Sequence, residues 1–124
     1  MIPDKFLPDI ARLSERYGKP NLLANLNEAL SNDKAFLLWQ DRFLFVFKDC
    51  SKPTGDHGLF IWIGIHKDKT LSIADYLKIE RMAKHSGYKY IQFETKRSGF
   101  NKLASKHGYH AIGLRNGFTI WEKR

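Results

Sequence analysis

The sequence has little of what holds many small secreted or metal-stabilised domains together. Cys50 is its single cysteine, so no intramolecular disulfide can form, and the five histidines are scattered without the spacing of a zinc site. The first residues lack the basic and apolar segments of a secretory signal. The longest apolar run, Leu59 to Ile65, is too short to span a bilayer. We therefore expect a soluble, cytoplasmic protein with no resident metal and no membrane partner.

Negatively charged side chains are also in the minority. The chain has 21 lysines and arginines against 13 aspartates and glutamates, a formal net charge of +8. Such an excess attracts anions, whether nucleic acid, acidic lipid or a polyphosphate such as coenzyme A, and in many small proteins it serves solubility alone. The charge predicts an anionic partner without selecting one.

Apolar surface, in contrast, is sufficient for one ordinary domain. Hydrophobic residues make up 43% of the 124 positions, with nine phenylalanines, five tyrosines and three tryptophans. A core built from them can stabilise a domain of this size without disulfide or metal. No repeat, low-complexity segment or linker interrupts the chain, so residues 1–124 are expected to form a single domain.

Residues 1–33 are predicted to form a pair of helices. Apolar residues from Phe6 to Tyr17 recur at spacings of four, three and four, the period of a helix stripe. Pro8 suits the first turn of this helix and Gly18 its end. Leu22, Leu26 and Leu30 lie on one face of a second helix, and residues 31–33 end it with turn-forming side chains.

From residue 35 onward the pattern changes to strands. Residues 35–39 and 43–47 are aromatic and apolar and flank Gln40-Asp41-Arg42, which predicts a hairpin. Residues 49–58, with one proline and two glycines, are expected to form a loop. Leu59–Ile65 is apolar on both faces, as is typical of a central strand.

Helices and strands alternate in the second half. A helix is predicted from about Leu71 to His85, a strand over residues 88–94, a helix over 100–107, and a hairpin of 109–114 with 118–122 around Asn116-Gly117. Strand–helix–strand units need a parallel crossover, whereas hairpins are antiparallel. The fold class is therefore α/β (α+β), with one mixed, mainly antiparallel sheet and two helices in residues 35–124.

This order of elements resembles the GNAT acyltransferases over roughly residues 35–124. In that family, the strand before the central helix leads into a turn written Arg/Gln-x-x-Gly-x-Gly/Ala, whose amides hold the pyrophosphate of acetyl-CoA. The equivalent stretch is Lys69-Thr70-Leu71-Ser72-Ile73-Ala74, with Lys for Arg/Gln and Ser for the first Gly. The resemblance implies a three-layer α/β/α fold. It also implies an acetyl-CoA site at five residues: Lys69, Leu71, Ser72, Ile73 and Ala74. An ordinary helix start capped by Ser72 is the alternative.

A second stretch, residues 97–109, resembles the family pattern Asn-x-x-Ala-x-x-Leu-Tyr-x-Lys-x-Gly-Phe. It matches at Leu103, Lys106 and Gly108, and Tyr109 stands for Phe. Three positions depart from the pattern: Arg97 for Asn, Phe100 for Ala and Ala104 for Tyr. In the family that Tyr often protonates the departing CoA thiolate, so the resemblance implies a reduced member, a kind that occurs among phage-encoded proteins.

His66 is the candidate general base, because it ends the predicted central strand and imidazole titrates near neutral pH. A solvated histidine is the alternative, and the preceding loop offers Asp56 and His57 for the same work. Glu80 is predicted to form an ion pair with Lys84, four residues further along its helix.

Basic residues gather in and around the last predicted helix: Lys96, Arg97, Lys102 and Lys106. They can contact the phosphates of nucleic acid or of CoA, or form a solvated face.

Two hypotheses of function follow. The first is an acyl-CoA-dependent N-acyltransferase that acts on an amine. The second is a catalytically silent GNAT-like domain that binds nucleic acid or a protein.

Overall fold

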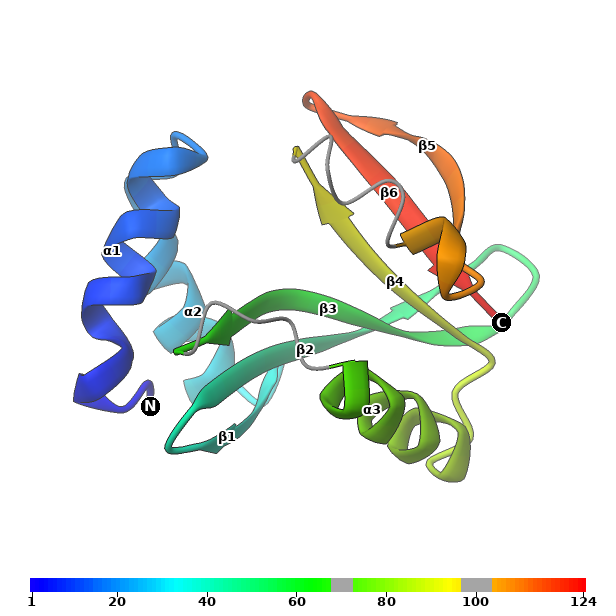
Figure 1. Ribbon diagram of the computed structural model, residues 1–124, viewed down its shortest axis with the longest axis horizontal. Coiled ribbons are helices and arrows are strands. Elements are labelled where there is room, and N and C mark those ends of the chain that lie inside the picture. The colour runs from blue at the N-terminus through cyan, green and yellow to red at the C-terminus, as the bar shows by residue number, and fades with distance from the viewer. Residues whose placement is uncertain (68–72, 97–103) are drawn as a thin grey trace. The chain divides into compact units, whose positions relative to one another are not determined.

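The computed structural model describes residues 1–67, 73–96 and 104–124, with the side chains of 73–75 left aside (Figure 1). The elements run in the order η1 (Asp4–Phe6), α1 (Leu7–Arg16), α2 (Leu22–Ser31), β1 (Phe36–Gln40), β2 (Phe43–Ser51), β3 (His57–His66), α3 (Ile73–His85), β4 (Tyr90–Thr95), β5 (His110–Arg115) and β6 (Phe118–Lys123). This confirms the predicted succession. Most of the helix predicted over 100–107 lies outside the described residues, and residues 104–106 are helical.

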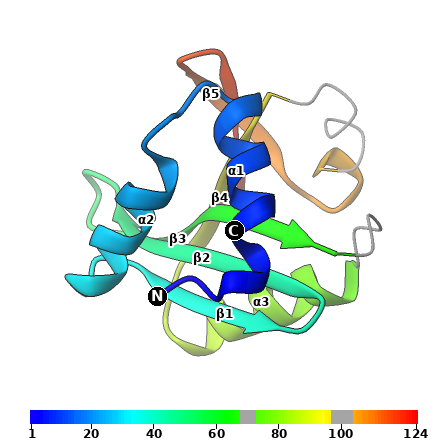
Figure 2. The ribbon, with the colours of Figure 1, turned by 90° about the vertical axis from the view of Figure 1, so that its left-hand side faces the viewer.

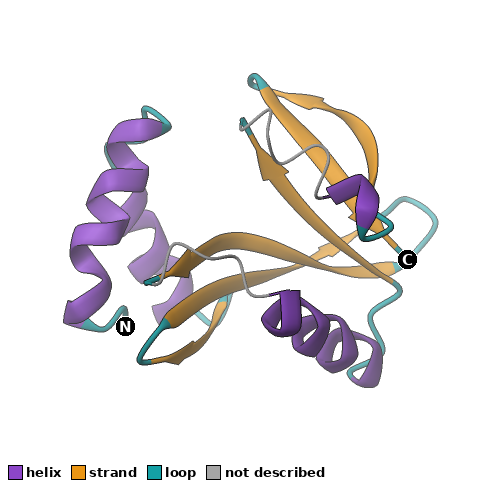
Figure 3. Ribbon diagram, in the orientation of Figure 1, coloured by secondary structure: helices purple, strands orange, loops and turns teal. Residues whose placement is uncertain are grey.

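The strands form one sheet in the order β1-β2-β3-β4-β6-β5 (Figure 3). β3 and β4 pair in parallel, and α3 makes the crossover between them. The pairs β1–β2, β4–β6 and β5–β6 are antiparallel. The prediction of a mixed, mainly antiparallel sheet is confirmed.

The loop expected over residues 49–58 is shorter than predicted. β2 continues to Ser51 and β3 begins at His57, so the strands take both ends of the predicted loop. The amide of Lys52 donates to the carbonyl of Asp56 at 3.0 Å, and that of Gly55 donates to the carbonyl of Lys52 at 2.9 Å. These bonds close a tight turn and let the hairpin extend further than the composition indicated.

By their contacts, the residues divide into two compact units. The first comprises Met1–Lys48 and Ile63–Thr70. Its α1 and α2 run alongside each other (Figure 2), and its core includes the fully buried Phe6, Leu26 and Phe45. The helix stripes predicted from spacing thus supply part of this core, and β2 supplies another part.

The second unit comprises Asp49–Trp62 and Leu71–Arg124. Its core includes Leu59, Ile79 and Trp121, each at most 5% exposed, whereas every residue of β5 is exposed. No helix among the described residues has the length and apolar character needed to cross a membrane.

Candidate functional site

His66 is the last residue of β3, as predicted. Its side chain is half-buried, and its ring meets that of Phe45 edge-on, with the centroids 5.3 Å apart. Phe45 is fully buried in β2, so the imidazole has a fixed apolar wall on one side. The role of His66 as a general base stays a prediction.

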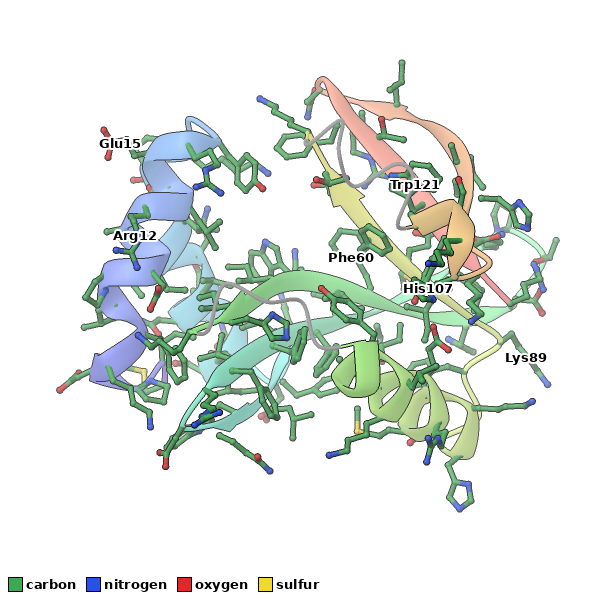
Figure 4. All side chains as sticks on the ribbon, in the orientation of Figure 1. Arg12, Glu15, Phe60, Lys89, His107 and Trp121 are labelled. Atoms are coloured by element: carbon green, nitrogen blue, oxygen red, sulfur yellow. The ribbon has the colours of Figure 1, made fainter. Side chains whose placement is uncertain are left out.

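A polar network that the sequence did not reveal fastens the end of β3 to α1. Lys67 Nζ donates to Asp9 Oδ2 and to the carbonyl oxygen of Lys5, each at 2.6 Å, and lies 5.0 Å from the ring centre of Phe6. Arg12, labelled on α1 in Figure 4, donates to Asp9 Oδ1 at 2.5 Å. Three contacts thus hold the side chain of Lys67, the residue that follows the candidate base His66.

Asp9 is fixed in its charged form by this network. Burial alone would raise the pKa of its carboxyl, but hydrogen bonds and charges from Lys67 and Arg12 outweigh burial and lower the pKa. Asp9 is therefore a weak proton acceptor, and we assign it a positioning role. Asp9 and Lys67 are 58 residues apart, so no motif spacing could have revealed the pair.

The candidate cofactor turn connects β3 to α3. Three of its five candidate residues lie outside the described residues: Lys69, Leu71 and Ser72. Their contacts with a cofactor stay predictions. Ile73 and Ala74 are the first two residues of α3. The start of such a helix offers main-chain amides and the positive end of its dipole to an anion.

The parallel pairing of β3 with β4 is short. It joins Gly58–Ile61 to Tyr90–Phe93, and in the described part of the sheet it stops there, although β4 continues to Thr95. On its other edge, β4 pairs with β6 from Ile91 to Thr95. Glu94 and Thr95 therefore lie outside the parallel ladder with β3.

The candidate phosphate-binding residues are only partly described. Lys96 and Lys106 are exposed, and Lys96 Nζ lies 4.7 Å from the ring centre of Phe118. Arg97 and Lys102 lie outside the described residues. A common surface made by these four side chains stays a prediction.

The predicted ion pair between Glu80 and Lys84 was wrong. The hydroxyl of Tyr109 donates to Glu80 Oε1 at 3.1 Å, and Lys123 donates to Oε2 at 3.0 Å. Lys123 is in β6, and Tyr109 immediately precedes β5, so both partners come from the C-terminal part of the chain. Burial first, and then the charge and hydrogen bond of Glu80, raise the pKa of Tyr109. Glu80 therefore links α3 to the C-terminal strands.

A second polar cluster surrounds Glu122 on β6. Lys52 Nζ lies 2.7 Å from Glu122 Oε1, to which Gln92 Nε2 also donates at 2.9 Å. The same ammonium lies 4.6 Å from the ring centre of Tyr90. Burial raises the pKa of the Cys50 thiol, although the interaction with Tyr90 opposes the shift. Cys50 is therefore protonated at neutral pH and is no activated nucleophile.

In the described ranges, no group of three or more His, Cys, Asp and Glu side chains could hold a metal ion.

Asp56, a second candidate base, forms an ion pair with Arg124, whose Nη1 lies 3.3 Å from the carboxylate.

Comparison with protein-family models and with curated proteins gave no match. Solved structures, however, share the fold. A GNAT-family acetyltransferase from Listeria monocytogenes aligns with a TM-score of 0.66 and 13% identity, over 97% of this chain and 86% of its own. The PaiA N-acetyltransferase of Thermoplasma acidophilum, solved with coenzyme A, aligns with 0.61 and 18%, over 100% and 80%.

A third similar structure is Naa50 of Arabidopsis thaliana, solved with the bisubstrate analogue CoA-Ac-MVNAL. It aligns with a TM-score of 0.52 and 12% identity, over 99% of this chain and 95% of its own. At these identities the likeness concerns the backbone and not the active-site side chains. The strand order, the parallel β3–α3–β4 crossover and these alignments lead to one conclusion: the chain has the fold of the GNAT acetyltransferases.

Proposed function

We propose that the protein is an acyl-CoA-dependent N-acyltransferase. The observation that carries this proposal is the fold itself, because similar structures were solved with coenzyme A or with a CoA-peptide analogue. Two features of the second unit support it further. α3 begins within the candidate turn, at Ile73, and β4 runs past the end of its parallel pairing with β3.

The pyrophosphate of CoA would rest on the main-chain amides of residues 72–74, with Lys69 adding a positive charge. The first turn of a 13-residue helix fits an anion of this kind. One feature weakens the site relative to a glycine-rich turn. Ser72 has a Cβ that would crowd a diphosphate. We therefore expect a lower affinity than a glycine-rich turn would provide.

In the reaction, the nitrogen of a neutral amine attacks the thioester carbonyl, a C–N bond forms and the C–S bond breaks. The proton of the amine goes to His66 or to water, and the thiolate leaves as CoA. Ala104 occupies the position at which the family often has a tyrosine acid, and it is buried with no titratable group. Catalysis would thus rely on proximity and orientation more than on acid assistance.

Thermal unfolding with millimolar acetyl-CoA tests the cofactor site. A ligand present at about 100 times its dissociation constant adds roughly 2.7 kcal/mol, which raises the midpoint by several degrees. The Ser72→Glu variant should lose the shift, because its carboxylate occupies the anion position. Ser86→Glu is the matched control: the same change at an exposed residue just past the other end of α3 should keep the shift.

The outcome decides between the two hypotheses of function. A shift that both variants keep would place the ligand elsewhere. No shift in the wild-type protein would contradict the proposal and favour a silent binding domain.

Release of CoA thiol in the presence of an amine panel tests the chemistry. His66→Ala should lower kcat and leave the acetyl-CoA stabilisation intact, since it removes a proton acceptor and no cofactor contact. Unchanged kcat across the pH range would remove His66 from the reaction and leave water as the acceptor.

A further inference from the structure

The outward face of α3 is unusual in its side chains. Ile79 and Ala83, four residues apart, are buried at 1% and 2% exposure and define the inward face. The residues at the opposite positions of the helix are exposed: Leu77, Lys78, Arg81, Met82, Lys84 and His85. We call this set the α3 surface. From Lys78 to His85 it extends about 10 Å along the helix axis.

The described charges of the α3 surface have one sign. Lys78, Arg81 and Lys84 are cations, and Lys89 projects from the segment that follows the helix (Figure 4). The described carboxylate of the helix, Glu80, is engaged by the C-terminal strands. In the described residues no ion pair occupies the three helix cations. They are therefore free to pair with an incoming anion.

Two exposed apolar side chains on the α3 surface favour one class of anionic partner over the others. Leu77 and Met82 are 40% and 36% exposed, and they belong to the same surface as the cations. Hydrated phosphates of a nucleic acid would leave these side chains without an apolar partner. A lipid surface would require the apolar face of the helix, which is turned into the protein. Methionine and arginine are instead enriched where proteins meet.

We propose that the α3 surface docks a protein partner with an acidic amphipathic helix, whose carboxylates pair with the cations and whose apolar residues cover Leu77 and Met82. The apolar contacts would provide close packing, and the charges would steer association and set orientation. This inference does not depend on the acyltransferase proposal, since it uses neither the cofactor turn nor His66.

Fluorescence anisotropy with a labelled 20-residue peptide, built of Glu and Leu at helical spacing, tests the proposal. We expect saturable binding that weakens about tenfold in Lys78→Glu/Arg81→Glu and by a similar factor in Leu77→Ser/Met82→Ser. Lys96→Glu/Lys106→Glu is the matched control, which makes the same charge change at two exposed lysines outside α3. It should change the affinity by less than about twofold. Circular dichroism checks that each variant is folded. If Lys78→Glu/Arg81→Glu does not fold, Lys78→Ala/Arg81→Ala is measured in its place.

A 20-base-pair DNA duplex and phosphatidylserine vesicles are the competing probes. The proposal is overturned if either is bound more tightly than the peptide, or if the peptide does not bind. It is also overturned if peptide affinity is insensitive to Leu77 and Met82, or falls equally in the control variant.

Discussion

Gly58 of β3 and Tyr90 of β4 are direct partners in the parallel register, and they allow a sharp test of packing in the second unit. A Cβ added to Gly58 would lie 2.1 Å from Cε2 and 2.3 Å from Cζ of the Tyr90 ring. Carbon atoms in ordinary contact are about 3.5 to 4.0 Å apart. Gly58→Ala therefore cannot be accommodated unless the ring moves, although alanine is normally no worse than glycine in a strand.

The ring has little freedom to move. Tyr90 is 3% exposed, and its face is covered by Lys52 Nζ at 4.6 Å and by Arg124 Cζ at 5.8 Å from the ring centre. Overpacking a dense site costs about 1–3 kcal/mol. Because displacing the ring also loosens both cation–π contacts, we expect a loss of about 3 kcal/mol in the free energy of unfolding.

Urea unfolding followed by tryptophan fluorescence measures this loss, with the buried Trp121 as the reporter. The four proteins compared are the wild type, Gly58→Ala, Tyr90→Ala and the double variant. Tyr90→Ala alone should cost about 3–5 kcal/mol through the cavity it leaves. In that background, Gly58→Ala should cost less than about 0.5 kcal/mol, because the ring it would strike is absent.

Gly113→Ala is the matched control. A Cβ at Gly113 meets nothing within 4 Å, so this change on β5 should be close to neutral. If Gly58→Ala cost the same in both backgrounds, or if Gly113→Ala were equally destabilising, steric overlap with Tyr90 would not be the cause and the reasoning would fail.

Three further predictions concern polar groups of the second unit. Although burial raises the pKa of Glu122, hydrogen bonds from Lys52 and Gln92 outweigh it and lower the pKa. The interactions of Glu122 therefore stabilise the protein above the pKa that Glu122 has in the unfolded chain, and this stabilisation is lost as the pH falls through its pKa in the folded state. The melting temperature of Glu122→Gln should therefore fall less steeply towards acidic pH than that of the wild type. Glu80→Gln should lower the free energy of unfolding by about 1 kcal/mol in urea titrations, and an unchanged midpoint would contradict its linking role. Cys50 should react slowly with a thiol reagent until urea unfolds the chain, and fast labelling of the native protein would contradict a protonated, half-buried thiol.

Local features of the fold could be read from the sequence. Asn116 and Gly117 adopt φ of 51° and 83°, as a two-residue hairpin turn with both central residues in the left-handed region requires. The stripe that begins with Phe6 and Ile10 is buried where its spacing placed it. Both features depend on residues within one or two turns of each other, so periodicity and turn chemistry are enough to predict them.

The candidate site was predictable only in part. The local sequence pattern predicts the end of β3 near His66 and the start of α3 near Ile73. The order of helices and strands along the chain predicts the GNAT-like fold. Whether Ser72 and Lys69 hold a pyrophosphate depends on the path of the turn, and it stays a prediction. The packing of His66 against Phe45 also depends on which strands are neighbours, which no local spacing states.

The sequence by itself determined the elements, their order, the helix stripes and the hairpin turn, because neighbouring residues set these through backbone dihedrals and side-chain period. Only the tertiary structure decided which charges meet. It paired Lys67 with Asp9 across 58 positions and Lys123 with Glu80 across 43, and it opposed Gly58 to Tyr90. The strength of an ion pair or a contact depends on distance and burial in the folded chain, and these are properties of the packing that no spacing along the sequence encodes.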